Sequence, residues 1–307
     1  MHPRIITALA LWGALAAGGG GRFLAADVQP PITTLSVGGV SRSFILHVPR
    51  GFGLQPPVGL SPLVLVFHGG GGSARTMPRF TGFDALSDQE GFFVAYPDSF
   101  NRSWNDSRGL SPADDVGFVH ALIGSLRGRY PIDPARVYAT GISAGGFFSQ
   151  RLACDLAGDV SAVAAVAATM PEPLLPICKP AQAVSVLFMH GVSDPIVRIE
   201  GGPVLRDRGN AVSLLSAVRF WRDFDGTAAT SVGADLPDQV SDGTHVHRDL
   251  YRGGRQGTEV VVYTIAGGGH TWPGGSQYLP AFFVGKASGN LDATSTIWEF
   301  FKAHARR

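Results

Sequence analysis

Ser143 lies in a Gly-Ile-Ser-Ala-Gly pentapeptide, residues 141–145, which matches the Gly-x-Ser-x-Gly pattern of a nucleophilic serine. Glycine makes up 41 of the 307 residues, so the pattern alone can arise by chance. Its significance depends on the flanking sequence. A strand-like run, residues 137–140, precedes it, and a helix-compatible run, residues 147–156, follows. A nucleophile elbow requires this strand, turn and helix order, because the serine sits on a sharp turn. Ser143 is therefore predicted to attack an acyl carbon.

A nucleophilic serine needs a base that takes its proton. His270 is the preferred base among nine histidines, because it follows the strand-like run 260–265 and comes after the serine in the chain. His68 precedes the serine, and His190 is expected to support the loop that carries the acid. We therefore predict that the His270 ring accepts the proton of the serine hydroxyl.

The acid that orients the base is expected between the serine and the histidine in chain order. Asp194 meets this condition and follows the apolar run 184–189, whereas other aspartates of the interval follow helical or loop-like stretches (Asp223, Asp225 and Asp242). A buried carboxylate that accepts from His270 would select the ring tautomer whose other nitrogen is free. The alternative role of Asp194 is to cap the turn before Pro195.

His245 and His247 form a His-x-His pair on a strand-like run, which could hold a metal ion. No third ligand is apparent, so two solvent-facing side chains of a strand are the preferred interpretation. We expect neither a metal nor another cofactor.

Four glycines follow His68, directly after the apolar run 63–67. This loop resembles the Gly-rich loop of esterases that gives a backbone N–H to the oxyanion hole. Gly70 is the expected donor, with Gly71 second, and the N–H of Ala144 is the expected partner. A flexible turn is the alternative, and a phosphate-binding loop is disfavoured because the next residues, 73–75, lack the Walker Lys-Ser/Thr pair.

Short apolar runs alternate with amphipathic stretches along most of the chain. This alternation predicts a single α/β domain over residues 27–307, with a mostly parallel central sheet and helices on both of its faces. The expected strands are residues 43–48, 63–67, 92–96, 137–140, 162–167, 184–189 and 260–265, and the expected helices are 113–127, 147–156, 211–224 and a last one capped by Asp292.

The first 26 residues are predicted to be a signal peptide. Residues 1–4 are cationic, and the apolar run 5–17 is too short to span a bilayer. Cleavage after Ala16 and cleavage near residues 25–26 both remain open, and an uncleaved terminus or a membrane anchor is the alternative. The protein is expected to be secreted, extracellular or periplasmic, with no membrane association after cleavage.

The charges and the cysteines limit the partners and the compartment. With 25 Lys+Arg against 24 Asp+Glu, the net charge of +1 lacks the cationic excess of a nucleic-acid binder, so nucleic acid is not expected. Cys154 and Cys178 are the only cysteines, and an oxidising compartment favours a disulfide between them over two small buried thiols.

Taken together, four motifs resemble the secreted polyhydroxybutyrate depolymerase and feruloyl esterase family of α/β-hydrolases, close to carbohydrate esterase family 1. The resemblance spans about residues 33–303, and its motifs are 68–72, 141–146, 190–194 and, most specific, the Gly-Gly-His-Thr-Trp-Pro-Gly-Gly stretch 268–275. It implies an α/β-hydrolase fold, a triad of Ser143, Asp194 and His270, and a disulfide beside the nucleophile helix.

The resemblance also implies a reaction. We expect a serine carboxylic ester hydrolase that acts through an acyl-enzyme on feruloyl (hydroxycinnamoyl) esters or on hydroxyalkanoate oligomers and polyesters, as small-molecule or oligomeric substrates. An acyltransferase with the same triad and a non-catalytic binding protein are the alternatives. Trp104 and Trp272 are candidate stacking faces for the acyl group. Packing beneath a loop is an equal alternative for Trp104 and the preferred one for Trp272.

Overall fold

The computed structural model describes residues 31–53, 59–205 and 207–306. The predicted signal peptide, residues 1–26, lies outside the described residues. Among the described residues, no helix is both long and apolar enough to cross a membrane.

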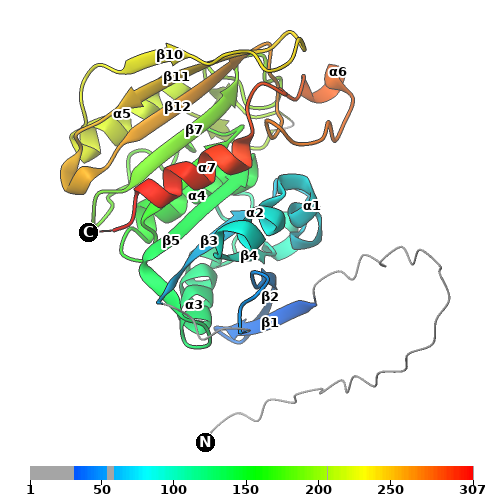
Figure 1. The fold of residues 1–307 in the computed structure, drawn as a ribbon, viewed down its shortest axis with the longest axis vertical. Helices are drawn as coiled ribbons and strands as arrows, with labels where there is room; N and C mark the ends of the chain where they lie inside the picture. Colours follow the sequence, from blue (N-terminus) through cyan, green and yellow to red (C-terminus); the bar gives the residue numbers. More distant parts are fainter. Residues whose placement is uncertain (1–30, 54–58, 206, 307) are drawn as a thin grey trace, which may run out of the picture.

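A large mixed sheet forms the centre of the molecule (Figure 1). Its strands are β1 (Ile32–Val37), β2 (Val40–His47), β3 (Ser61–Phe67), β4 (Phe93–Pro97), β5 (Ile132–Ile142), β6 (Ala162–Val166), β7 (Ser185–Gly191), β10 (Val232–Asp235), β11 (His245–Tyr251) and β12 (Val260–Ala266). They lie in the order β1-β2-β4-β3-β5-β6-β7-β12-β11-β10. The central strands from β4 to β12 run parallel, whereas the strands at both edges are antiparallel. A separate ribbon pairs β8 (Gly202–Pro203) with β9 (Asn210–Ala211).

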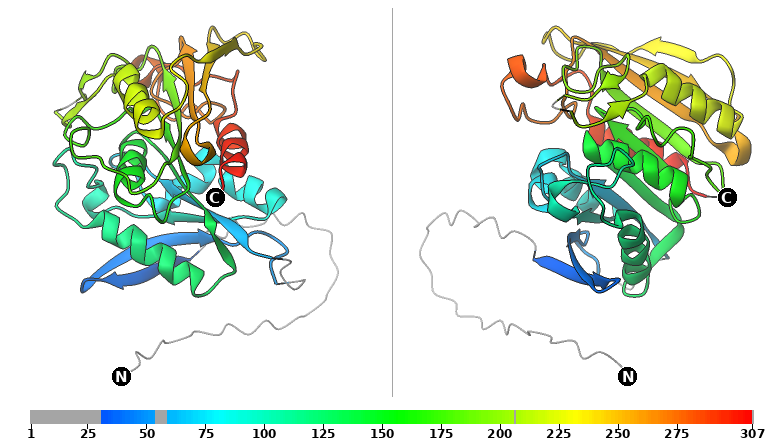
Figure 2. Two further views of the ribbon diagram at one scale, coloured as in Figure 1. Left: turned by 90° about the vertical axis from the view of Figure 1, so that its left-hand side faces the viewer. Right: turned by 180° about the vertical axis from the view of Figure 1, so that it is seen from behind.

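Helices cover both faces of the sheet (Figure 2). They are α1 (Met77–Thr81), α2 (Phe83–Glu90), α3 (Asp115–Arg127), α4 (Ala144–Asp155), α5 (Leu214–Asp225), α6 (Ala281–Val284) and α7 (Ala293–Ala303), with 3₁₀ turns at Ala74–Thr76, Phe100–Arg102 and Arg255–Gly257. Buried side chains of α3, α4 and α5 share one apolar core, and those of α1, α2 and α7 share the other. The mostly parallel, two-sided α/β architecture predicted from the sequence is thereby confirmed.

Side chains of the central strands alternate between the two cores. Along β3, Leu63, Leu65 and Phe67 belong to the core under α4, whereas Val64 and Val66 belong to the core under α7. This is the period of two that a strand imposes when both faces are covered, so the run carries no polar residue.

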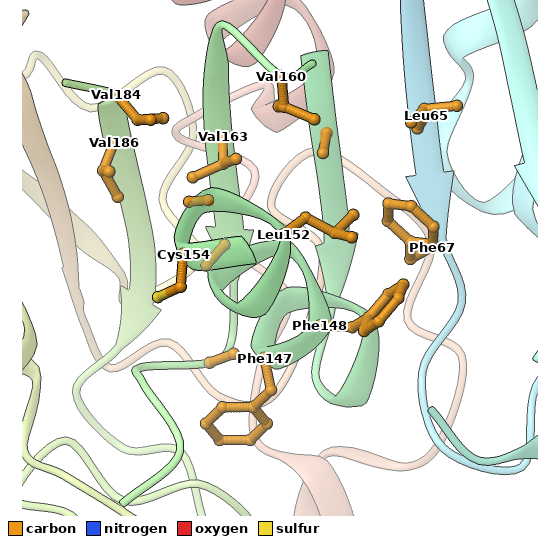
Figure 3. Close-up of a cluster of buried hydrophobic side chains, with 14 of the residues drawn as sticks. Leu65, Phe67, Phe147, Phe148, Leu152, Cys154, Val160, Val163, Val184 and Val186 are labelled. Carbon is orange, nitrogen blue, oxygen red and sulfur yellow. The ribbon is translucent and has the colours of Figure 1, made fainter. Parts of the chain in front are cut away.

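The helix α4 lies across the middle of the sheet (Figure 3). Its Phe148 ring stands edge-on to Phe67 of β3 at 5.1 Å, and Leu152 is fully buried. Nearly every residue of α4 is buried, because the helix is covered by strands on one side and by loops on the other. The N-terminus of α4 is therefore firmly placed at the carboxyl edge of the parallel strands.

The disulfide between Cys154 and Cys178 joins the last turn of α4 to the loop that precedes β7. Their Cα atoms lie 5.1 Å apart, and both side chains are buried. The pairing predicted from the sequence is confirmed.

Removing this disulfide should destabilise the fold. The bridge closes a loop with a sequence separation of 24, and in the chain-entropy model a loop of this size contributes about 3 kcal/mol. We expect a Cys154→Ala, Cys178→Ala double variant to lose about that much free energy of unfolding in urea titrations. Each single variant should lose a similar amount, because either one breaks the bridge. An unchanged urea midpoint under oxidising conditions would contradict this account.

A buried carboxyl at the end of α5 makes stability depend on pH. Burial raises the pKa of Asp225 to about 7, against an ordinary value of 3.8, although its Oδ1 accepts from the Val184 amide and the Arg255 charge opposes the shift. As pH rises from about 4 to 7, the unfolded chain releases this proton before the folded chain does, so stability falls over that window.

Asp225→Asn should remove this dependence. The wild type loses stability as the pH rises, and the variant does not. We therefore expect the Tm difference between Asp225→Asn and the wild type to shift by a few degrees in favour of the variant between pH 5 and pH 8. Asp223→Asn is the matched control, because the neighbouring Asp223 side chain is 77% exposed. Parallel Tm curves for Asp225→Asn and the wild type would show that the carboxyl titrates normally.

Candidate active site

Ser143 stands between β5 and α4 in a strained backbone conformation. Strand β5 ends at Ile142 and α4 begins at Ala144, while Ser143 has φ 56° and ψ −120°. Such a conformation costs of order 1–3 kcal/mol and persists only where surrounding structure imposes it. The side chain is held at the carboxyl edge of the sheet, at the N-terminus of a buried helix.

Gly145 shows why the elbow needs glycine. A Cβ on this residue would lie 2.2 Å from the carbonyl oxygen of Phe67, which belongs to the neighbouring strand β3. We expect Gly145→Ala to push α4 off the sheet, with a loss of several kcal/mol of stability and most of the activity. Gly124→Ala on α3 is the control, because a Cβ there meets nothing within 4 Å. Equal urea midpoints for the two variants would show that the elbow tolerates the methyl group.

Asp194 and His270 form a buried pair. The ring Nδ1 of His270 lies 2.7 Å from Oδ2 of Asp194, and the other carboxylate oxygen accepts from the amides of Ile196 and Val197 at 2.8 and 2.9 Å. Because the carboxylate only accepts, Nδ1 of the neutral ring carries the proton and Nε2 is left as the acceptor. The pair thus has the tautomer that proton abstraction from a serine requires.

The loops that carry these two residues are bound to each other. Asp194 follows β7 and His270 follows β12, two strands that pair in parallel. The amide of Ser193 donates to the carbonyl of Gly268 at 2.9 Å, and the amide of Val192 donates to Ile265 of β12. Adjacent parallel strands thereby deliver the acid and the base to one edge of the sheet.

The backbone of His270 is also hydrogen-bonded to the segment that precedes α7. Its amide donates to the carbonyl of Val284 at 2.5 Å, and its carbonyl accepts from the Tyr278 hydroxyl at 3.0 Å. Burial raises the pKa of Tyr278 to about 12, so this hydroxyl keeps the proton that it donates. The histidine is fixed through its side chain and through both of its backbone polar groups.

Ser143 and His270 line one cavity of about 680 Å³. The loop of residues 69–72 lines the side nearest the elbow, where a Cβ on Gly69 would lie 3.6 Å from the Cβ of Ser143. The remaining wall is largely apolar and comes from α1, the loops after β7 and the segment around α6 (Met77, Phe80, Ile196, Leu205, Leu279 and Phe283). The volume is in the usual range for small-molecule sites.

Gly70 and Ala144 are the candidate oxyanion donors. A Cβ on Gly70 would lie 3.8 Å from the Cβ of Ala144, so the two residues are neighbours. Ala144 opens α4, where the first amides have no partner within the helix. The amide of Gly71, the second choice, is occupied because it donates to Arg102 at 3.0 Å. In the described part of the chain, we find no acceptor for the Gly70 or Ala144 amide.

His68 and His190 support the two loops through hydrogen bonds of their rings, although His68 also lines the cavity. The ring Nε2 of His68 accepts from the Ser99 amide, and Nδ1 donates to the carbonyl of Gly69. His190 donates from Nε2 to the carbonyl of Val197 at 2.8 Å, which agrees with the supporting role expected for it. Burial lowers the pKa of both rings, so both are neutral near pH 7.

The two tryptophans lie elsewhere than expected. Trp104 is 1% exposed, stacks on Phe148 at 4.8 Å and donates to the carbonyl of His68, so it supports the Gly-rich loop from below. Trp272 is also 1% exposed and donates to the Thr294 hydroxyl of α7. Neither lines the cavity, so the expectation of an acyl-stacking face is corrected to a packing role for both.

Sequence reasoning missed the aromatic wall of the cavity. Phe80 lies on α1 and stands edge-on to Tyr278 at 5.6 Å, while Phe283 lies on α6. These helices are too short to show a period, although the apolar stretch 278–284 was a signal in itself. His247 pairs with Asp235 of the edge strand β10, and His245 pairs with Asp238 in the loop that follows this strand. No metal-binding group of three or more ligands gathers among the described residues.

Fold and site chemistry together define an α/β-hydrolase. The family model described as "Esterase PHB depolymerase" matches residues 42–207. The chain belongs to this family and is a carboxylic ester hydrolase.

Individual relatives agree with this assignment. A protein of Nocardia uniformis subsp. tsuyamanensis named "Putative esterase NocK" is 31% identical, with 90% of this chain and 83% of that protein covered. Feruloyl esterase B of Piromyces equi is 28% identical over 75% of this chain, which spans only 42% of that enzyme.

Solved structures share the fold. A thermostable esterase superposes with a TM-score of 0.58 at 16% identity, covering 91% of this chain and 64% of that one. The acetyl xylan esterase of Aspergillus awamori gives a TM-score of 0.55 at 12% identity, covering 78% and 94%.

Proposed function

We propose that the protein is a secreted serine esterase in which Ser143 is the nucleophile, His270 the general base and acid, and Asp194 the residue that orients the histidine. The observation that carries this proposal is the buried 2.7 Å hydrogen bond between Asp194 and His270, at the cavity that also exposes the strained Ser143. This combination is costly to the fold, because it buries a carboxylate and keeps a serine in a strained backbone conformation, so we attribute it to catalysis.

The proposed reaction proceeds in two halves. The Ser143 oxygen attacks the ester carbonyl while its proton passes to Nε2 of His270, and the amides of Gly70 and Ala144 hold the resulting oxyanion. The carbon–oxygen bond to the alcohol then breaks, and the histidine returns the proton to the leaving oxygen. Water repeats the sequence on the acyl-enzyme and releases the acid.

Feruloyl (hydroxycinnamoyl) esters and hydroxyalkanoate oligomers are the proposed substrates. The aromatic and aliphatic wall of Phe80, Tyr278, Leu279 and Phe283 suits a flat cinnamoyl group or a short alkanoate chain. The feruloyl esterases among the relatives and the family description support the same two classes.

Secretion and the extent of the domain belong to the proposal. The disulfide between Cys154 and Cys178 supports an oxidising compartment, in line with cleavage of residues 1–26 as a signal peptide and a mature domain of residues 27–307.

A fluorophosphonate probe tests the proposed nucleophile. We expect one label per folded chain, located on Ser143 by peptide mass spectrometry, and none on heat-unfolded protein. A hydrolysis panel of methyl ferulate, hydroxybutyrate oligomers, acetylated xylan and short nitrophenyl esters then identifies the acyl group. A folded protein that takes no label, or takes it on another serine, would overturn the assignment.

A further inference from the structure

The cavity carries one permanently charged side chain. Its wall is apolar on most sides, and of the described residues that line it, Arg208 alone is an arginine or lysine and none is an aspartate or glutamate. Arg208 lies at the tip of the turn between β8 and β9, outside every element that holds the proposed triad. A lone cation at the mouth of an apolar cavity attracts an anionic ligand.

The guanidinium reaches the Gly-rich loop itself. Its Nη1 lies 2.6 Å from the position that a Cβ on Gly70 would occupy, and its Cζ lies 3.7 Å from the same point. A side chain at residue 70 would therefore displace the arginine. The charge lies beside Gly70, one of the proposed oxyanion donors, so a group that it binds lies close to the scissile carbonyl.

The backbone of Arg208 is hydrogen-bonded, whereas its guanidinium forms no hydrogen bond with any described residue. The carbonyl of Arg208 accepts from Nη1 of Arg108 at 3.1 Å, and Arg108 is itself buried in a 2.5 Å ion pair with Asp106, over the ring of Phe147. Within the part of the chain that the structure describes, the Arg208 guanidinium has no carboxylate, carbonyl or aromatic partner. A buried scaffold thus presents an unpaired cation to the cavity.

We infer that Arg208 binds a carboxylate of the substrate, so that the enzyme prefers esters with a free acid group a few bonds from the reacting carbonyl. This inference rests on the proposed ester hydrolysis at Ser143. The planar guanidinium matches a carboxylate in a forked geometry, and charged hydrogen bonds of this kind change affinity by about tenfold or more. The carboxylate belongs either to the acyl half, as in a dicarboxylic hemiester, or to the alcohol half, as in a hydroxyacid dimer.

Matched pairs of substrates test the inference and distinguish its two forms. The first pair is 4-nitrophenyl hydrogen succinate and its methyl ester, and the second is the hydroxybutyrate dimer and its methyl ester. We expect the wild type to favour the free acid by about tenfold in kcat/KM in one pair. Arg208→Gln should reduce that ratio to about one through KM, and Arg208→Lys should keep part of it.

The control removes the same charge from a nearby exposed position. Arg79→Gln on α1 alters a neighbouring groove but not this cavity, so it should retain the acid preference. Raising the salt to about 1 M should shrink the preference of the wild type, because the exposed guanidinium is then screened.

Three outcomes would overturn the inference. They are a wild type with no acid preference in either pair, a preference that survives in Arg208→Gln, and an equal loss of kcat on acids and methyl esters, which would mark Arg208 as an oxyanion contact. Failure of the proposed function is distinguishable, because no ester of either pair would then be hydrolysed by the wild type.

Discussion

Ser143→Ala should lower kcat by about 10⁶-fold while the protein stays folded. The loss is large because the histidine and aspartate cannot act without the nucleophile, so one substitution removes the whole covalent route. Alanine fits the elbow, since the serine side chain caps nothing in α4 and Ala removes only the oxygen. The measurement is steady-state hydrolysis of the best ester of the panel, with circular dichroism as the test of folding.

Ser125→Ala is the matched control for this substitution. It removes the same hydroxyl from the half-buried side chain of Ser125 on α3, away from the cavity. Its kcat should equal that of the wild type. Full esterase activity in purified Ser143→Ala would refute the proposed nucleophile.

Asp194→Asn should lower kcat by about 10⁴-fold with little effect on KM. The asparagine oxygen can still accept from the amides of Ile196 and Val197, which leaves its NH₂ group facing Nδ1 of His270. An NH₂ group donates, so the ring must accept at Nδ1 and carry its proton on Nε2. The histidine then presents a hydrogen to the serine where it should present a lone pair.

A second histidine–aspartate pair provides the control. His120 and Asp159 are also joined through Nδ1 at 2.7 Å, but His120 is 66% exposed and neither residue lines the cavity. Asp159→Asn should leave kcat unchanged. If Asp194→Asn kept more than a tenth of the activity, the carboxylate would not be the group that orients the base.

The parallel core of the fold could be predicted because its strands are buried on both faces. Such strands appear as unbroken apolar runs, and β3, β5, β6, β7 and β12 all coincide with runs recognised in the sequence. The edge strand β1 alternates between exposed and half-buried residues, and β10 is mostly exposed. Their sequences do not differ from those of ordinary surface chain, so these strands were missed.

The candidate triad was found for the same reason that the core was found. Each proposed member directly follows a recognisable buried strand, so strand order alone brings Ser143, Asp194 and His270 to one edge. The cavity wall follows no such rule. Burial of Trp104 depends on its stack with Phe148, and the reach of Arg208 depends on the Asp106–Arg108 pair beneath it, contacts that no local pattern encodes.

Tyr278 and Val284 each form a hydrogen bond with the backbone of His270. Within residues 278–284, these two positions therefore hold the histidine, and the positions between them do not. Substitutions at these two anchors shift the base together with the wall. Substitutions between them, as at Leu279 or Phe283 of the cavity wall, should change the shape of the cavity without removing either contact. Substitutions in residues 279–283 can therefore change which ester is bound while the position of the histidine is kept. We expect substrate specificity to evolve through this stretch.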